Sequence, residues 1–141
     1  MYERILVPVD GSEQSKAAAR TGSELAEASD AAVSLLCVIE TGPLGSIRLP
    51  GESGAAEETF REHAADLLEQ ITADVGEDID VTTEIRDGVP VREILEYAGA
   101  IDADLIVMGS RGREGIDRMM LGSVTEGVTR HGDIDVLVAN S

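Results

Sequence analysis

"DLIVMGSRGREGIDRMMLGSVTEG", residues 104–127, joins a short aliphatic run to a segment rich in glycine and arginine. The run at 104–108 does not alternate and stops at Gly109, which is typical of a parallel strand buried on both faces. Residues 3–9, "ERILVPV", and residues 32–39, "AVSLLCVI", have the same character. These three runs predict the centre of a parallel sheet.

Two further segments extend this sheet. Residues 79–86, "IDVTTEIR", alternate between apolar and polar side chains, which predicts a strand nearer an edge. One face of that strand would consist of Ile79, Val81, Thr83 and Ile85. The run "DVLVAN" at 135–140 predicts the fifth strand.

Helical patterns lie between the predicted strands. One runs from Ser12, a suitable N-cap, to Ser29 and buries small residues, so it can lie close to a sheet. The second has an apolar stripe made of Phe60, Ala64, Leu67, Leu68, Ile71 and Val75. A third begins near Pro90, and a fourth runs from Gly122 or Ser123 to near Gly132.

Strictly alternating strands and helices predict one α/β domain over residues 1–141, with helices on both faces of the sheet. Residues 41–54 depart from this rhythm, and their glycines and prolines favour a surface loop. The apolar run near the N-terminus is too short for a signal peptide or a membrane span. Cys37, the single cysteine, excludes an internal disulfide and favours a buried hydrophobe over a reactive thiol. We therefore expect a protein of the reducing cytoplasm.

The charge is strongly acidic. The formal net charge is -17, and Lys16 is the single lysine. Acidic residues with few lysines indicate a protein kept soluble in concentrated salt, where repulsion between carboxylates is screened. The same charge argues against nucleic acid or an anionic membrane as a partner.

The glycine-rich segment after residue 108 could hold a phosphate. Gly109 and Gly112 would let the backbone turn sharply and approach a ligand. Gly122 and Ser123 would lie at a helix N-terminus, where free amides favour an anion, and the hydroxyls of Ser123 and Thr125 could donate too. The arginines of the segment would offset the acidity of the chain.

An ordinary structural explanation competes with this site. Glycine turns after strands are common, Ser123 could be a helix cap alone, and loop arginines are usually solvated. Asp10, at the end of the first strand, could contact a ligand or simply form an Asp-Gly turn. His63 is expected at the surface and His131 in a helix C-terminal turn, so we expect no metal site made by the protein alone.

The spacing of this segment resembles a known motif. Gly109, two residues, Gly112, nine residues, Gly122 and Ser123 match the G-x2-G-x9-G-[ST] nucleotide motif of the universal stress protein family, in its ATP-binding branch. "YERILVPVDGSEQS", "RDGVPVREILEYA", "DADLIVMGSRG" and "DVLVA" are similar to that family in the same order. The resemblance covers essentially the whole chain.

The resemblance implies a fold and a ligand. The fold would be a Rossmann-like, open five-stranded parallel sheet of order 3-2-1-4-5. ATP, with Mg or Mn, would lie between the ends of strands one and four. Pro8, Val9 and Asp10 would lie against the adenine and ribose, and Val38 against the base. The full set of implied nucleotide-binding residues is Pro8, Val9, Asp10, Ser12, Val38, Met108, Gly109, Ser110, Arg111, Gly112, Gly122, Ser123, Val124 and Thr125.

The resemblance also implies a homodimer through the last strand, residues 135–139. Asp135 stands where the family often has proline, which weakens that expectation. The function implied is an ATP-binding protein with a regulatory or protective role under stress. Any hydrolysis should be slow, since no general base or catalytic lysine is evident. The alternatives are a dimeric interaction module that binds no nucleotide, and a true enzyme such as an ATPase or nucleotidyl transferase.

Overall fold

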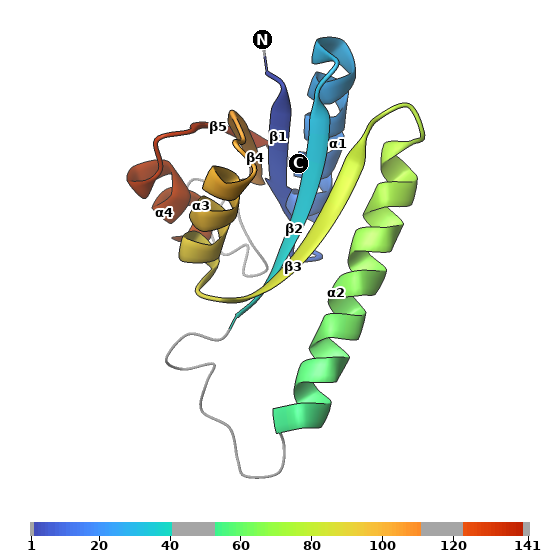
Figure 1. Ribbon diagram of the computed structural model, residues 1–141, viewed down its shortest axis with the longest axis vertical. Helices are drawn as coiled ribbons and strands as arrows, with labels where there is room; N and C mark the ends of the chain where they lie inside the picture. The colour runs from blue at the N-terminus through green and yellow to red at the C-terminus, as the bar shows by residue number, and fades with distance from the viewer. Residues whose placement is uncertain (1, 41–52, 111–122, 140–141) are drawn as a thin grey trace.

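The computed structural model describes residues 2–40, 53–110 and 123–139. Five strands alternate with four helices in this part of the chain (Figure 1). The elements in order are β1 (Arg4–Pro8), α1 (Glu13–Ser29), β2 (Ala32–Glu40), α2 (Ser53–Val75), β3 (Val81–Gly88), α3 (Pro90–Ala100), β4 (Leu105–Gly109), α4 (Ser123–His131) and β5 (Asp135–Ala139).

The strands form one parallel sheet in the order β3-β2-β1-β4-β5, as predicted. β3 is an edge strand, but it spans 81–88 rather than 79–86. Pairing with β2 sets these bounds, because the ladder runs from Val33 opposite Val81 to Glu40 opposite Gly88. A shift of two residues keeps the same side chains on each face. The prediction for this strand is therefore correct in its faces and wrong in its ends.

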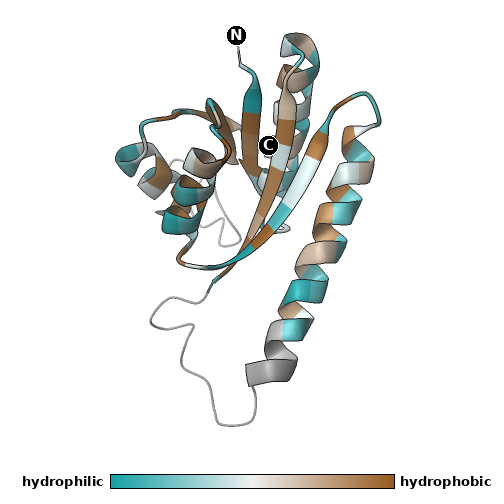
Figure 2. Ribbon diagram, in the orientation of Figure 1, coloured by the Kyte–Doolittle hydropathy of each residue, from teal (hydrophilic) through white to brown (hydrophobic). Residues whose placement is uncertain are grey.

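Two apolar cores lie on opposite faces of the sheet. Ile5, Val7 and Leu35 point toward α1 and α2, whereas Leu6 and Ile106 point toward α3 and α4. Figure 2 shows the resulting hydrophobic colour on the central strands and a mixed colour on β3. The double coverage explains why the central runs do not alternate, since both faces of those strands are buried.

The α1 helix lies very close to the sheet. A Cβ atom built on Gly22 would come within 2.9 Å of Val7 Cγ2, so only glycine fits this approach. Ser12 caps the helix, because its side chain accepts a hydrogen bond from the Ser15 amide at 3.1 Å. Both predictions for this helix are confirmed.

The prediction of an apolar stripe on α2 is wrong at Phe60, its first residue. Ala64, Leu68 and Ile71 are buried against the sheet, but Phe60 is 52% exposed. In Figure 1 the first turns of α2 extend beyond the end of the sheet. The apolar periodicity in the sequence of α2 therefore extends past the point where the sheet ends.

The amino ends of β1 and β4 are tied together. Asp104 accepts hydrogen bonds from the amides of Glu3 at 2.9 Å and Arg4 at 3.1 Å. Direct pairing of β1 with β4 then joins Ile5 to Leu105 and Leu6 to Ile106. The carboxyl ends of these neighbouring strands lead to α1 and α4, the connections where open α/β sheets bind ligands. None of the helices in the described ranges is long and apolar enough to cross a membrane.

Candidate functional site

The turn after β1 is built by short polar side chains. Asp10 Oδ1 accepts a hydrogen bond from the Ser12 amide at 2.9 Å, and Gly11 between them has a φ of 87°. Ser15 is buried, and its hydroxyl lies 3.3 Å from the Asp10 amide and 3.0 Å from the Ser12 carbonyl. Asp10 thus has the turn role that the sequence allowed. Its role toward a ligand stays a prediction.

Gly109 ends β4 between the first turns of two helices. A Cβ atom there would come within 2.8 Å of the Gln14 carbonyl carbon and oxygen, so glycine is required for contact with α1. On the α4 side, Thr125 Oγ1 donates to the Gly109 carbonyl at 2.8 Å. The Ser110 amide continues the strand pairing by donating to the Ala139 carbonyl at 3.1 Å. The N-termini of α1 and α4 therefore converge on the end of β4.

This convergence favours an anion. First-turn amides of a helix have no partner within the helix, and the helix dipole places partial positive charge there. The carboxylate of Glu126, in the first turn of α4, forms an ion pair with Arg130, which reduces its repulsion of an anion. Ser123 at the start of α4 is exposed, and Val124 is half-buried. Two helix N-termini at one sheet edge can hold a phosphate group.

The structure changes the role predicted for the Thr125 hydroxyl as a donor to a phosphate. Its side chain is 4% exposed, and its hydroxyl proton is used in the bond to Gly109. A phosphate contact from Thr125 would therefore have to come from its backbone amide, while the hydroxyl of exposed Ser123 stays accessible.

The residues implied for the nucleoside lie at neighbouring strand ends. Pro8 ends β1, and the Val9 amide donates to the Leu36 carbonyl of β2 at 2.8 Å. Val38 lies two residues further along β2, half-buried against the core on the α3 side. Met108, next to Gly109, is buried in that same core. The fold thus brings the ends of β1, β2 and β4 together.

Part of the motif falls outside the described residues. Arg111, Gly112 and Gly122 lie there, as does the predicted loop at 41–54 in its first twelve residues, 41–52. The sequence did not single out Gln14 and Ser15, although a Ser12 N-cap implies that the amide of Ser15, three residues later, is the one capped. No signal in the sequence marks the contact of Gln14 with Gly109.

The described residues contain no group of acidic, histidine or cysteine side chains able to hold a metal. His63 is exposed, His131 lies in the last turn of α4, and Cys37 is buried, as predicted. A shallow, open hollow lies along residues 10–14, at the turn that Asp10 and Ser12 build. The chemistry available here is hydrogen bonding to a ligand by backbone amides and hydroxyls.

Comparison with known proteins agrees with this architecture. The family model described as "Universal stress protein family" matches residues 1–140. A universal stress protein of Methanocaldococcus jannaschii, MJ0531, is 34% identical over 139 residues, which cover 98% of this chain and 82% of that protein.

Solved structures of the family have the same fold. UspA from Lactobacillus plantarum superposes with a TM-score of 0.86 at 30% identity, covering 98% of this chain and 97% of that one. A universal stress protein solved in complex with cAMP gives a TM-score of 0.71 at 25% identity, with coverage of 99% and 97%. On its sequence and on its fold, the chain belongs to the universal stress protein family.

Proposed function

We propose that the protein binds ATP, with Mg²⁺ or Mn²⁺, at the carboxyl edge of the sheet and uses its nucleotide state in a stress response. The observation that carries this proposal is the convergence of the first turns of α1 and α4 on Gly109. A polyphosphate would be held by amides of α4 from Ser123 onward, and the adenosine would extend past Asp10 toward Val38.

Two further observations support the proposal. The family relative in complex with cAMP is a nucleotide binder of the same fold. The spacing of Gly109, Gly112, Gly122 and Ser123 matches the motif of the ATP-binding branch. Metal would be bound chiefly by the phosphates, because the described side chains offer no metal cluster. A cytoplasmic location fits the single buried Cys37.

Isothermal titration of Mg-ATP into the protein in molar KCl tests the proposal. Two substitutions at Ser123 separate its donors. Ser123→Ala removes the hydroxyl, whereas Ser123→Pro also removes the first amide of α4 at a position where proline suits a helix. A hydrogen bond to a charged group contributes about 1.5–3 kcal/mol, so the proline variant should bind at least about tenfold more weakly than the alanine variant.

Folded wild-type protein that takes up no Mg-ATP at millimolar concentration would refute ATP binding. Circular dichroism of each variant supplies the control for folding. Equal ATP affinities of the alanine and proline variants would show that the first amide of α4 does not bind the nucleotide.

A homodimer through β5 is the second part of the proposal. β5 is an edge strand, and Leu137 at its middle is 37% exposed. Pairing of β5 with the same strand of a second chain would cover Leu137 and give hydrogen-bond partners to the backbone groups at this edge of the sheet. Leu137→Asp should convert a dimer to a monomer in light scattering, whereas Asp135→Asn at the strand start should leave the dimer intact. A monomeric wild-type protein would contradict this part.

Two alternatives remain testable by the same samples. A dimeric module that binds no nucleotide predicts a dimer with no heat of ATP binding. An enzyme predicts rapid multiple turnover of ATP that disappears in Asp10→Ala.

A further inference from the structure

The end of β2 lies in a two-stranded extension of the sheet. Pairing of β1 with β2 runs to Pro8 opposite Leu36, whereas pairing of β2 with β3 continues to Glu40 opposite Gly88. Within the described part of the chain, the strand that pairs with residues 38–40 is therefore β3. Two strands by themselves are marginally stable. The position of this extension depends on side chains that tie it to the helices on either face.

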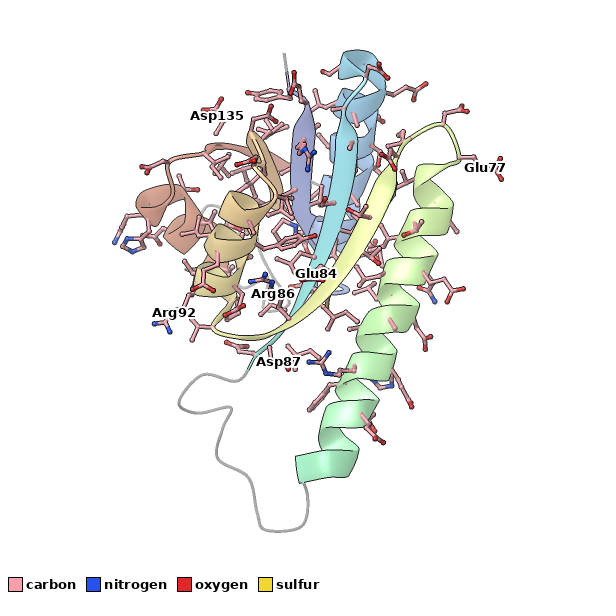
Figure 3. The ribbon with its side chains drawn as sticks, viewed as in Figure 1. Glu77, Glu84, Arg86, Asp87, Arg92 and Asp135 are labelled. Carbon is pink, nitrogen blue, oxygen red and sulfur yellow. The ribbon has the colours of Figure 1, made fainter. Side chains whose placement is uncertain are left out.

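Arg86 makes the tie on the face where Val38 lies. It stands directly opposite Val38 in the ladder, so the two side chains are neighbours on the α3 side of the sheet. Arg86 Nη1 lies 3.4 Å from Glu93 Oε1 and 4.0 Å from Glu96 Oε2, both on α3. The guanidinium also stacks 5.0 Å from the centre of the Tyr97 ring. Figure 3 shows Arg86 between β3 and α3.

This cluster is partly shielded from water. The side chains of Arg86 and Glu93 are 27% and 17% exposed. Glu93 also packs on the strand end itself, since a Cβ atom on Gly88 would come within 2.8 Å of Glu93 Oε2. Arg86 is further held by Glu84 within β3, with Nε 3.4 Å from Oε2. A planar guanidinium that pairs and stacks at once fixes geometry in a way that lysine does not.

A second tie on the other face is more exposed. Asp87, the next residue of β3, points away from α3 and forms an ion pair with Arg61 of α2 (Figure 3). The Arg61 and Asp87 side chains are 49% and 44% exposed. Solvent-exposed ion pairs contribute little to stability. The Arg86 cluster is therefore the stronger tie, and the Arg61–Asp87 pair is its natural control.

The helix that receives Arg86 also sets the position of α4. A Cβ atom on Gly127 of α4 would come within 2.7 Å of Val91 Cγ2, so α3 and α4 pack in close contact. Likewise, a Cβ atom on Gly132, just after α4, would lie 2.7 Å from Leu95 Cδ2 of α3. Through α3, Arg86 links the end of β2 to the helix whose first turn faces the carboxyl edge of the sheet.

We propose that Arg86 is a positioning residue for the nucleotide: it fixes the end of β2, where the base is accepted, relative to the first turn of α4, where the phosphates are accepted. This inference rests on the proposed ATP binding and assigns a specific task within it. Arg86 acts through Val38 and α3, and it needs no direct contact with the ligand.

The experiment compares a ligand that has a base with one that has none. Mg-ATP and Mg-tripolyphosphate are titrated in molar KCl into the wild-type protein, Arg86→Met and Arg61→Met. Loss of preorganisation at the base end should weaken ATP binding about tenfold in Arg86→Met and leave tripolyphosphate binding unchanged within about twofold. Arg61→Met should match the wild type for both ligands. Arg86→Lys, which keeps the charge without the planar fork, should lose part of the ATP affinity.

One further variant and three outcomes make the test decisive. If Arg86→Met does not fold, Glu93→Gln removes one ion-pair partner at constant shape and should weaken ATP alone, by a smaller factor. Equal ATP affinity in the wild type and Arg86→Met overturns the inference and leaves ATP binding intact. Equal loss for ATP and tripolyphosphate also overturns it, since Arg86 would then serve general stability. Wild-type protein that binds no ATP overturns both this inference and the proposed function.

Discussion

The Thr125 hydroxyl donates to the Gly109 carbonyl at 2.8 Å and joins the first turn of α4 to the last residue of β4. The bond is buried, since Thr125 is 4% exposed. It holds a helix N-terminus at the edge of the sheet, so the geometry of the candidate site depends on it.

Thr125→Val should therefore destabilise the protein and displace α4. The substitution leaves the Gly109 carbonyl buried without its partner, which costs about 1–3 kcal/mol. Thr125→Ser keeps the hydroxyl and should lose much less. Urea denaturation measures both, and a valine variant as stable as the serine variant would show that water replaces the bond.

Gly109→Ala should be strongly unfavourable. The added methyl would lie 2.8 Å from the Gln14 carbonyl, which is backbone and cannot swing aside. Overpacking of this kind costs about 1–3 kcal/mol, and separation of α1 from β4 should also weaken ATP binding.

Gly99→Ala is the matched control for Gly109→Ala. Gly99 lies in α3, where an added methyl would meet nothing within 4 Å, so alanine should stabilise that helix by about 0.5–1 kcal/mol. Thermal unfolding of both variants checks the pair. Equal effects at the two positions would contradict the close approach at Gly109.

The alkaline limit of stability should depend on Tyr97. Burial raises the pKa of Tyr97 above its usual 10.0, and the Glu84 carboxylate adds to the rise, against the lowering effects of Ser34, Arg86 and Thr82. The folded state then holds the proton more tightly than the unfolded state. Its contribution to stability is complete below about pH 10 and is lost as the pH rises through the raised pKa.

Tyr97→Phe should accordingly flatten the fall in unfolding free energy above about pH 10. The pKa of Tyr2 is also raised, chiefly by its hydrogen bond to Asp135, so Tyr2→Phe is measured in parallel. Urea denaturation across this pH range gives the slopes. A Tyr97→Phe slope equal to that of the wild type would exclude Tyr97 as the titrating group.

The salt dependence should have a local source on α2. Exposed carboxylates recur along this helix at spacings of four, four and three residues: Glu58, Glu62, Asp66 and Glu69. Like charges at this spacing destabilise a helix by about 0.2–0.5 kcal/mol per pair, and salt screens them. The melting temperature should rise from dilute to molar KCl, and this rise should shrink in Glu62→Gln.

Glu77→Gln is the control for the α2 row. Glu77 is exposed in the turn between α2 and β3, away from the row (Figure 3), and its removal should affect the salt response less. A melting temperature that is the same in dilute and molar salt would contradict the salt-adapted interpretation.

The sequence predicts most of the fold because burial on two faces leaves a direct pattern in it. Continuous apolar runs marked β1, β2 and β4, and the small residues of α1 indicated its close approach to the sheet. The exposed position of Phe60 could not be predicted, since periodicity does not encode where the neighbouring sheet ends. The ends of β3 likewise depend on its pairing with β2.

The sequence predicts only part of the candidate site. Glycine marked the end of β4, and Asp10 and Ser12 marked the turn before α1. The Thr125 bond to Gly109 and the meeting of Arg86 with Glu93 join residues from different elements, so they appear only once the chain is folded. Spacing along the chain carries no information on such contacts.

A crystal structure with Mg-ATP, grown in high salt, tests the central claim most directly. We predict that the triphosphate lies against the first-turn amides of α4 and that the adenine lies beside Val38 at the end of β2. ATP bound elsewhere on the protein, or a crevice filled by the protein's own side chains, would contradict this claim.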